Sequence, residues 1–433
     1  MPESISRNAE RLLDLIEQRE LAWLSWGRVD GVLTRKEVEN SARETIPKGA
    51  KAAINELIEK SLLLDVDGLE TDQPKRKRYR SRFAETVRLL VRVRQIFQGQ
   101  KWQDAPQLVS DFRVAARPRK FPKREVSSAA LFSRETNWEP GEKDALEQMV
   151  PDEIKLSEFQ ARALFRLRAR IRETGDGMTI VSAGTGSGKT KAFYLPVLSW
   201  LAEVRRKAGN QYPKFARVIA LYPRNELLKD QLTEALGQVH SIAEKGGPII
   251  SIGAYFGKTP YSQDLAGKSR FNAWPKTEDR RGLVCPYLRC PQCSADLVWP
   301  LEARTELLEC PSDQCGFRTR EGQVVLTRKS MEGATPDVLF TTTEMMNRSL
   351  SVRQGRGILL GKNASSRPRV LLMDEIHTYY GTLGAHVALL LRRFRAAMAG
   401  AGKKPALDIV GLSATLENPE EFDDRFRESR NSN

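Results

Sequence analysis

Apolar and polar positions follow helical spacing in the first third of the chain and form strand-like apolar runs after residue 150. Residues 9–16 carry apolar side chains at helical spacing, and residues 51–60 repeat that pattern. Between them a helix is predicted to begin after Thr34, whose hydroxyl can cap its first turn. The apolar run at 62–66 predicts a strand followed by a turn.

Three short helices and a strand pair within about 65 residues indicate a winged-helix-like unit, a variant of the helix-turn-helix. We therefore expect a helical, basic domain at residues 1–98. Such a unit either binds DNA or serves as a structural or protein-docking domain, and the pattern is the same for both roles.

A basic run at residues 75–82 continues into a helix with two different faces. The apolar face comprises Phe83, Val87, Leu90 and Phe97, and the basic face comprises Arg88 and Arg92. These cations suit a phosphate backbone, although a solvated charged face has the same pattern. Residues 99–150 mix prolines with scattered charges, which predicts a linker or an irregular wrap around the core.

Beyond residue 150, apolar runs alternate with helix-like segments such as 191–204. The runs lie at 178–181, 218–222, 249–252, 338–340, 370–373 and 407–412. Continuous apolar strands separated by helices predict an α/β domain, here 151–433, with a parallel sheet covered on both faces. In such folds ligands bind at the carboxyl ends of the strands, where this chain places its polar clusters.

The first of these clusters is a glycine-rich loop between the strand at 178–181 and the helix at 191–204. Its loop residues are Gly184, Thr185, Gly186, Ser187 and Gly188. Backbone N–H groups of such a loop converge on phosphate oxygens, and the following helix adds positive potential. Lys189 would reach the β- and γ-phosphates, and Thr190 would hold Mg²⁺. The alternative is a glycine-rich turn without a ligand.

A pair of acidic residues follows the strand at 370–373. Asp374 is placed to hold Mg²⁺, usually through water, and Glu375 can orient and deprotonate an attacking water. The strand at 407–412 leads to Ser413-Ala414-Thr415, a hydroxyl-rich turn suited to sensing that site. Together with the phosphate loop, these residues predict a nucleotide hydrolysis site.

The amino-acid composition indicates what kind of partner the chain binds. The 433 residues suffice for two or three domains, and 70 Lys and Arg against 55 Asp and Glu leave a net charge of +15. This excess points to a polyanion, with nucleic acid the leading candidate. No apolar run approaches the roughly 20 residues that span a bilayer, and the N-terminus lacks the layout of a signal peptide. We expect a soluble, cytoplasmic protein with no membrane partner.

Five cysteines lie in a short insert at about 280–320. Cys290 and Cys293 form one close pair, and Cys310 and Cys315 form another sixteen residues later. This spacing predicts a four-thiolate zinc ribbon of structural type, with Cys285 as the spare or as a replacement ligand. Reduced thiols without metal and a redox role are the alternatives. The basic surroundings, which include Lys268, Arg270, Arg280, Arg281 and Arg289, suit either nucleic acid or a docked protein.

The motifs of the second half also occur in a familiar order. They are Gln160, AGTGSGKT at 183–190, YPRNEL at 222–227, YFGKTP at 255–260, TTTEMM at 341–346, DEIH at 374–377 and SAT at 413–415. This set resembles a superfamily 2 helicase. Within that superfamily it is similar to DEAH-type DNA helicases near the large-helicase-related group, including helicases of bacterial antiviral defence islands. The resemblance covers roughly residues 150–420 and implies a RecA-like first motor domain.

The resemblance implies a role for each matched residue. Gln160 would bind adenine, Lys189 and Thr190 would bind phosphate and Mg²⁺, Asp374 would bind Mg²⁺, and Glu375 would be the general base. His377 at the nucleotide site, with Ser413 and Thr415, would couple the ATP state to nucleic acid. The sugar-phosphate backbone of a bound nucleic-acid strand would run past Arg224, Gly257, Thr341 and Thr342.

Helicases of this kind have a second RecA-like domain with arginine fingers, whereas this chain ends eighteen residues after Thr415. The expected function is therefore the first half of an ATP-dependent DNA helicase or translocase motor, in bacterial defence or repair. It would be completed by a second RecA-like domain in another chain or a missing segment, and other defence-system subunits are further candidate partners. The alternative is an ATP-gated nucleic-acid-binding adaptor without turnover of its own. A small-molecule P-loop kinase explains neither DEIH, SAT nor the charge.

Overall fold

The computed structural model of the chain divides into two compact units, Met1–Lys120 and Phe121–Asn433, and each is described by itself. The residues described are 5–46, 48–66, 77–94, 98–99, 101, 105–107, 109, 112–115, 122–173, 177–184, 186–268, 273–362, 366–399 and 406–413. No helix in that part of the chain combines the length and apolarity needed to cross a membrane.

The first unit has the order of elements expected of a winged helix. The elements are α1 (Arg7–Leu24), β1 (Leu33–Thr34), α2 (Arg35–Thr45), α3 (Ala50–Glu59), β2 (Leu63–Asp65), β3 (Arg78–Ser81) and α4 (Arg82–Val91). The strands form an antiparallel sheet in the order β1-β3-β2. The predicted cap of α2 is confirmed: the Thr34 hydroxyl accepts from the Glu37 N–H, and the Glu37 carboxylate accepts from the Thr34 N–H at 2.7 Å.

The cationic face predicted from the basic run at 75–82 and the following helix is partly paired with carboxylates. Residues 75 and 76 lie outside the described residues, as does Phe97. Arg80 and Arg88 both pair with Glu85, and Arg92 pairs with Asp30 at 2.6 Å. The apolar stripe of α4 is also largely exposed, with Leu90 63% accessible. These three arginines are therefore paired within the unit, with Arg80 and Arg88 sharing one carboxylate.

The second unit begins at residue 121 rather than at 151, which corrects the expected boundary of the linker. Its first elements are β4 (Arg124–Val126), α5 (Ser128–Arg134), α6 (Pro140–Met149), β5 (Leu156–Ser157) and α7 (Glu158–Arg172). Pro140 lies at the start of α6, where its missing N–H costs nothing. The Gly141 N–H donates to Glu203 at 2.8 Å, and Arg168 of α7 forms a buried ion pair with Glu142 at 3.0 Å. These contacts make the segment part of the core.

The second unit is built on a seven-stranded sheet in the order β11-β8-β12-β7-β13-β14-β6. All its strand pairs are parallel. The strands are β6 (Gly177–Ser182), β7 (Val218–Tyr222), β8 (Ile252–Tyr255), β11 (Val324–Val325), β12 (Val338–Thr342), β13 (Val370–Met373) and β14 (Asp408–Ser413). The predicted parallel α/β sheet is confirmed. The strand predicted at 249–252 is observed as β8 at Ile252–Tyr255, and β11, with only two residues, was too short to predict.

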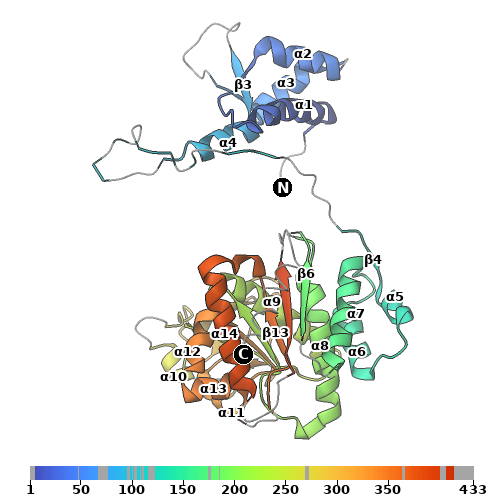
Figure 1. The fold of residues 1–433 in the computed structure, drawn as a ribbon, viewed down its shortest axis with the longest axis vertical. Coiled ribbons are helices and arrows are strands. Elements are labelled where there is room, and N and C mark those ends of the chain that lie inside the picture. Colours follow the sequence, from blue (N-terminus) through green and yellow to red (C-terminus); the bar gives the residue numbers. More distant parts are fainter. Residues whose placement is uncertain are drawn as a thin grey trace. The chain divides into compact units, whose positions relative to one another are not determined.

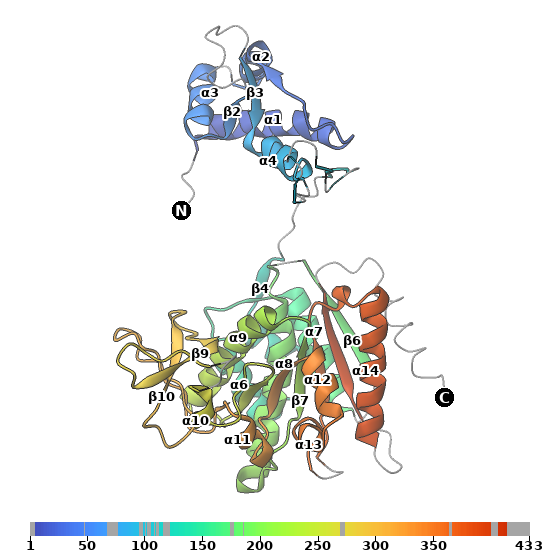
Figure 2. The ribbon, with the colours of Figure 1, turned by 90° about the vertical axis from the view of Figure 1, so that its left-hand side faces the viewer.

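Helices cover both faces of the sheet, as Figures 1 and 2 show. One face carries α6, α7, α8 (Lys189–Ala208) and α9 (Asn225–Glu244), and the other carries α11 (Arg328–Gly333), α12 (Thr343–Leu350), α13 (Arg353–Leu360) and α14 (Gly381–Ala399). Neighbouring residues of a strand point to opposite faces: Val218 and Ala220 pack in the first core, Ile219 and Leu221 in the second.

The cysteine insert packs against the rest of the second unit instead of standing apart from it. Its hairpin consists of β9 (Gly282–Arg289) and β10 (Asp296–Pro300), preceded by the short helix α10 (Gln263–Ala266). Trp274, Tyr287 and Trp299 of the insert are buried in the same core cluster as α9. The Arg289 N–H also donates to Thr233 of α9 at 3.2 Å.

Candidate functional site

The phosphate loop, the acidic pair and the Ser413 turn lie at one edge of the sheet. The loop follows β6, Asp374 follows β13, and β14 lies between those two strands and ends at Ser413. The Ala183 N–H donates to the Ser413 carbonyl at 3.1 Å, so the loop begins hydrogen-bonded to the turn. Because parallel strands end at the same edge, segments more than 180 residues apart in the sequence meet here.

Two glycines give the loop its shape. Gly186 and Gly188 have φ angles of 77° and 86°, in the left-handed region that favours glycine. A Cβ on Gly188 would also lie 2.6 Å from Nε2 of Gln160. Lys189 then begins α8, and the buried Ser187 hydroxyl has no hydrogen-bond partner among the described residues. Gly184 is exposed, and Thr185 lies outside the described residues.

Gln160 is placed to hold the loop. Its Nε2 donates to the Gly188 carbonyl at 2.7 Å, and its Oε1 accepts from the Ser157 N–H at 2.8 Å. The side chain is 1% exposed, so both ends of its amide are occupied inside the protein. This geometry favours a positioning role. The adenine contact implied by the resemblance stays a prediction, and it would require these bonds to open.

The acidic pair is linked to the end of β14 by short contacts. Asp374 Oδ1 accepts from the Glu375 N–H at 2.8 Å, and Glu375 Oε2 lies 3.1 Å from His377 Nδ1. His377 Nδ1 in turn lies 3.4 Å from the Ser413 hydroxyl. The series therefore runs from Asp374 through Glu375 and His377 to Ser413. Ala414 and Thr415 lie outside the described residues.

Burial shifts the pKa of the Asp374 carboxyl group. Its pKa is raised to about 6, mainly because burial removes hydration; the Glu375 carboxylate contributes to the rise, and Lys189 opposes it. Asp374 has no ion-pair partner among the described side chains. A buried carboxylate without its own cation, together with the Thr190 hydroxyl, is a donor set that fits Mg²⁺. Glu375 itself has a φ of 49°, a conformation that costs a non-glycine residue about 1 kcal/mol.

The sequence reasoning missed Gln231, a residue of α9. Its Nε2 donates to the Thr190 hydroxyl at 3.3 Å, and its buried Oε1 has no partner among the described residues. The Gln231 carbonyl accepts from the Tyr194 hydroxyl, which lies 3.1 Å from that of Tyr222 on β7. In the sequence Gln231 is one polar position among many on a helix, and only its approach to Thr190 distinguishes it.

The four residues expected along a nucleic-acid path lie at the ends of β7, β8 and β12, on the same edge of the sheet. Arg224 and Gly257 are exposed there. Thr341 is fully buried and donates to the Tyr255 carbonyl at 2.7 Å, so its side chain connects β12 to β8, and the nucleic-acid contact implied by the resemblance stays a prediction. Thr342 is 9% exposed, and its hydroxyl caps α12.

The structure brings the four predicted cysteines together. Their sulfur atoms all lie within 4.8 Å of one another, with 3.5 Å between Cys290 and Cys315 and 3.4 Å between Cys293 and Cys310. A disulfide would require about 2.05 Å, whereas four thiolates around a zinc ion at about 2.3 Å lie about 3.8 Å apart. The cluster therefore fits a tetrahedral metal ion. Cys285 is 1% exposed in the core, and burial raises its pKa to about 12, which makes it the spare.

Part of the second unit is similar to known proteins. Residues 158–264 match the model of the DEAD/DEAH box helicase family. The chain is 27% identical to the Druantia protein DruE of Escherichia coli (strain UMEA 4076-1) over 58% of its length, and 27% identical to the uncharacterized ATP-dependent helicase YprA of Bacillus subtilis (strain 168) over 21%. The structure of the DUF1998 helicase MrfA bound to DNA and AMPPNP aligns with 72% of this chain and 29% of that one, at 17% identity and a TM-score of 0.39.

The relatives are much longer than this chain. The aligned region spans 17% of the length of DruE and 11% of the length of YprA. The likeness therefore concerns the helicase domain, and it does not extend to the whole of those proteins.

Proposed function

We propose that this chain, which carries the DEAD/DEAH-box helicase domain of a superfamily 2 helicase, is the first RecA-like half of an ATP-dependent DNA helicase or translocase motor. The observation that supports this most is the series of contacts along one sheet edge. It links the phosphate loop to Ser413, Ser413 to His377, and His377 to the acidic pair. The parts of a nucleotide hydrolysis site are thus assembled in one place.

The residues of this edge have distinct tasks in the proposed reaction. The loop N–H groups and Lys189 bind the phosphates of ATP, and Thr190 and Asp374 hold Mg²⁺. Bound Mg²⁺ neutralises charge that develops on the phosphate oxygens. Glu375 orients the attacking water and accepts its proton, with His377 3.1 Å away to stabilise the carboxylate. Gln160 keeps the loop in register through its bond to the Gly188 carbonyl.

Helix α9 connects the nucleotide to the nucleic-acid path in this proposal. Arg224 is exposed at the N-terminal end of the helix, and Gln231 contacts Thr190 from the same helix. A shift of α9 when Arg224 engages a phosphate would move a group that contacts a Mg²⁺ ligand. His377 and Ser413, which also touch, provide a second route between the two sites.

A second RecA-like domain, in another polypeptide or another segment, would supply the arginine finger that completes the nucleotide site. In P-loop motors an arginine finger is worth about 10³–10⁵ in rate, so the first domain by itself is expected to turn over slowly. The charge of +15 supports nucleic acid as the partner, with DNA favoured. The likeness to a Druantia protein is consistent with the bacterial defence setting that the motif pattern resembles. Other subunits of such a system are candidate partners.

The cysteine cluster is proposed to hold a structural zinc ion. Four thiolates complete a tetrahedral site and leave no open position for chemistry. Because the hairpin of the insert shares a core with α9, the metal would support the helix that carries Arg224 and Gln231.

The proposal is tested by measuring ATP turnover of the purified chain with and without single-stranded DNA, alongside the Glu375→Gln variant. We expect turnover that DNA stimulates and that the variant loses by about 10²–10⁴-fold while still binding ATP. Tight binding of ATP and DNA without turnover, even after a second RecA-like domain is supplied, would favour the adaptor function. Undiminished turnover in Glu375→Gln would exclude Glu375 as the base.

A further inference from the structure

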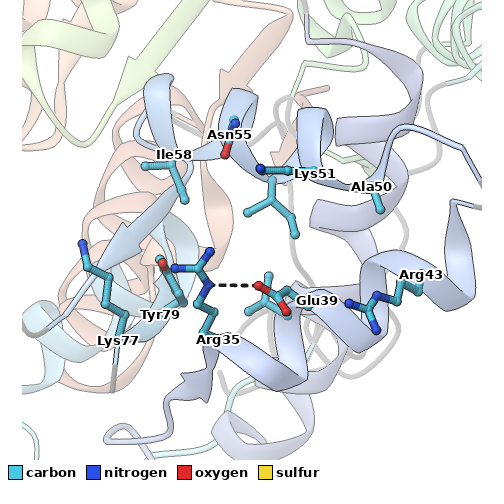
Figure 3. Close-up of a pocket in the computed structure, with 11 residues that line it drawn as sticks. Arg35, Glu39, Arg43, Ala50, Lys51, Asn55, Ile58, Lys77 and Tyr79 are labelled. Carbon is cyan, nitrogen blue, oxygen red and sulfur yellow. Dashed lines mark hydrogen bonds and ion pairs between the residues drawn. The ribbon is translucent and has the colours of Figure 1, made fainter. Parts of the chain in front are cut away.

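The N-terminal unit carries a groove that the motor function does not explain. It has a volume of about 610 Å³ and lies between α2, α3 and β3 (Figure 3). Its lining comprises Arg35, Val38, Glu39, Arg43, Ala50, Lys51, Ile54, Asn55, Ile58, Lys77 and Tyr79. In Figure 3, Lys51 and Ile58 extend from α3 toward the side of the groove formed by Arg35 and Glu39 of α2.

The lining is strongly cationic. It contains two arginines and two lysines, against Glu39 as its one carboxylate. Glu39 is occupied by Arg35 at 2.9 Å, and Lys77 is paired with Asp65 at 3.0 Å. Arg43 and Lys51 are exposed, and within the described residues neither has an ion-pair partner. The groove lining therefore holds two uncompensated cations, one from α2 and one from α3.

These cations differ from three arginines elsewhere in the unit, namely Arg80 of β3, Arg88 of α4 and Arg92 just after α4. There, Arg80 and Arg88 share Glu85, and Arg92 is held by Asp30. A polyanion would have to break those pairs, whereas Arg43 and Lys51 are available without such a cost. In the groove lining, one cation from α2 and one from α3 are thus available to a phosphate without the loss of an existing ion pair.

We propose that this groove is a second nucleic-acid site, which binds the phosphate backbone of a duplex alongside α3. Arg43 and Lys51 make the phosphate contacts, and the exposed Asn55, one turn after Lys51 on the same helix, faces the base edges. An asparagine amide can both donate to and accept from an adenine edge. The site would hold the substrate of the motor at a point outside the helicase domain.

The lining favours a duplex over two other occupants. Single strands bind by stacking bases on exposed aromatic rings, but Tyr79, the aromatic residue of the lining, is only 6% exposed. A peptide would anchor apolar side chains in the floor, yet Val38 is 1% exposed, and Ile58 is the lining residue with substantial apolar exposure, at 37%. What the groove presents is charge, which suits a phosphate backbone.

The test compares two charge reversals in the full-length chain. Arg43→Glu with Lys51→Glu changes the groove, and Arg7→Glu with Arg11→Glu makes the same charge change on exposed residues of α1 outside it. Binding of a short fluorescent DNA duplex is followed by anisotropy over a range of salt concentrations, and thermal melting checks folding. We expect the groove variant to bind at least about tenfold more weakly, with a salt slope shallower by about 2, and the control to change less than threefold.

Equal losses in both variants would mean general electrostatic attraction and would overturn the site. Unchanged duplex binding in the groove variant would also overturn the site. A loss of binding confined to single-stranded DNA or to a polyglutamate probe would overturn it as well, since it would point to another occupant. If the groove variant does not fold, the site is tested instead by lysine acylation of the unaltered chain with and without the duplex. The duplex should protect Lys51 but not Lys36, which lies on α2 outside the groove. Equal protection of both lysines would overturn the proposal.

Discussion

At the scale of single residues, the sheet edge places reactive side chains through backbone constraints. Glu375 has a left-handed backbone conformation directly after β13, and this turn directs its carboxylate toward His377 instead of continuing the strand. Gly188 has the same handedness in the phosphate loop, where Gln160 leaves no room for a Cβ. Strain of this kind persists when the surrounding sheet holds both ends of the turn in place.

Lys189 is expected to carry much of the affinity for nucleotide. Lys189→Ala removes the ammonium group at the start of α8 and should weaken ATP binding by about tenfold or more, since charged hydrogen bonds are worth about 1.5–3 kcal/mol. Fluorescence titration with a labelled ATP analogue measures this. Lys191→Ala, two positions later on the same helix, is the control. Unchanged affinity in Lys189→Ala would remove the phosphate-loop assignment.

Gln231 is expected to position Thr190 for Mg²⁺. Gln231→Ala removes a neutral hydrogen bond, worth about 0.5–1.5 kcal/mol, and should raise the Mg²⁺ concentration for half-maximal turnover by about 2–12-fold. The melting temperature should change little, and Gln231→Glu should restore part of the effect as an acceptor for the Thr190 hydroxyl. Gln238→Ala, on the same helix but bonded to Glu234, is the control. An equal Mg²⁺ requirement in both variants would argue against a positioning role.

At the scale of elements, the contacts between helices decide which segments belong to the motor domain. Helix α6 packs on α8 because Gly141 has no side chain, and its N–H donates to Glu203. Glu203 is 4% exposed and also binds Arg206 and Lys207. This junction joins the segment before residue 150 to the helix that follows the phosphate loop.

The same junction predicts a dependence of stability on pH. The hydrogen bond from Arg206, with others from Gly141 and Lys207, lowers the pKa of Glu203 from 4.5 to about 2. The stabilisation is therefore complete above about pH 4.5 and is lost as the pH falls toward 2. Glu203→Gln should lower the free energy of unfolding by about 2 kcal/mol at neutral pH, with the difference shrinking in that acid range. Urea unfolding at several pH values measures it.

Glu147→Gln provides the comparison, because Glu147 forms an exposed pair with Lys143 at 3.9 Å. Its effect on the free energy of unfolding should stay below about 1 kcal/mol. A pH-independent difference between Glu203→Gln and the unaltered chain would contradict the assigned pKa.

The cysteine insert should contain one zinc ion per chain. Cys293→Ser removes an exposed ligand and should release the metal, whereas Cys285→Ala, in the buried strand β9, should retain it. Metal analysis of the purified chain distinguishes the variants. Because the hairpin shares a core with α9, chelation should also lower the melting temperature. A metal-free purified protein, or equal metal content in both variants, would leave the cluster as unliganded thiols.

At the scale of the whole molecule, the chain combines two units with different charge chemistry. The second unit places the residues predicted to bind nucleotide and nucleic acid on one sheet edge, and the first presents a cationic groove. The DEAD/DEAH-box match covers residues 158–264 and so accounts for the motor but not for the groove. Anchoring on a separate unit would keep the substrate near the motor between rounds of turnover.

ATP turnover should depend on a second RecA-like domain. Adding a protein that supplies such a domain should raise turnover by about 10³-fold or more in the presence of DNA, because arginine fingers complete the phosphate site. The measurement is a titration of that protein at fixed concentration of this chain. The same titration with its finger arginines replaced by alanine is the control. A rate that the intact domain leaves unchanged would count against a split motor.

The motor fold was accessible from the sequence because its strands are buried on both faces. Continuous apolar runs predicted β7 and β13 at their observed bounds, and the polar clusters after them identified the functional edge. The segment at 121–150 was misjudged because its helices are short and rich in charge, and their burial depends on ion pairs such as Arg168 with Glu142. The bond from Thr341 to β8 could not be predicted, because a hydroxyl at a strand end looks the same whether it points to a ligand or to a neighbouring strand.

The sequence by itself determined which residues can do chemistry: a glycine-rich loop with Lys189, an acidic pair, and two cysteine pairs at metal-binding spacing. Only the tertiary structure decided which groups meet. Strand order brings Ser413 between the loop and the acidic pair, and helix packing brings Gln231 to Thr190. Carboxylates pair with Arg80, Arg88 and Arg92, while Arg43 and Lys51 remain available. The physical reason is that residue type and local periodicity are properties of neighbouring positions, whereas contact and charge compensation depend on partners distant in the chain.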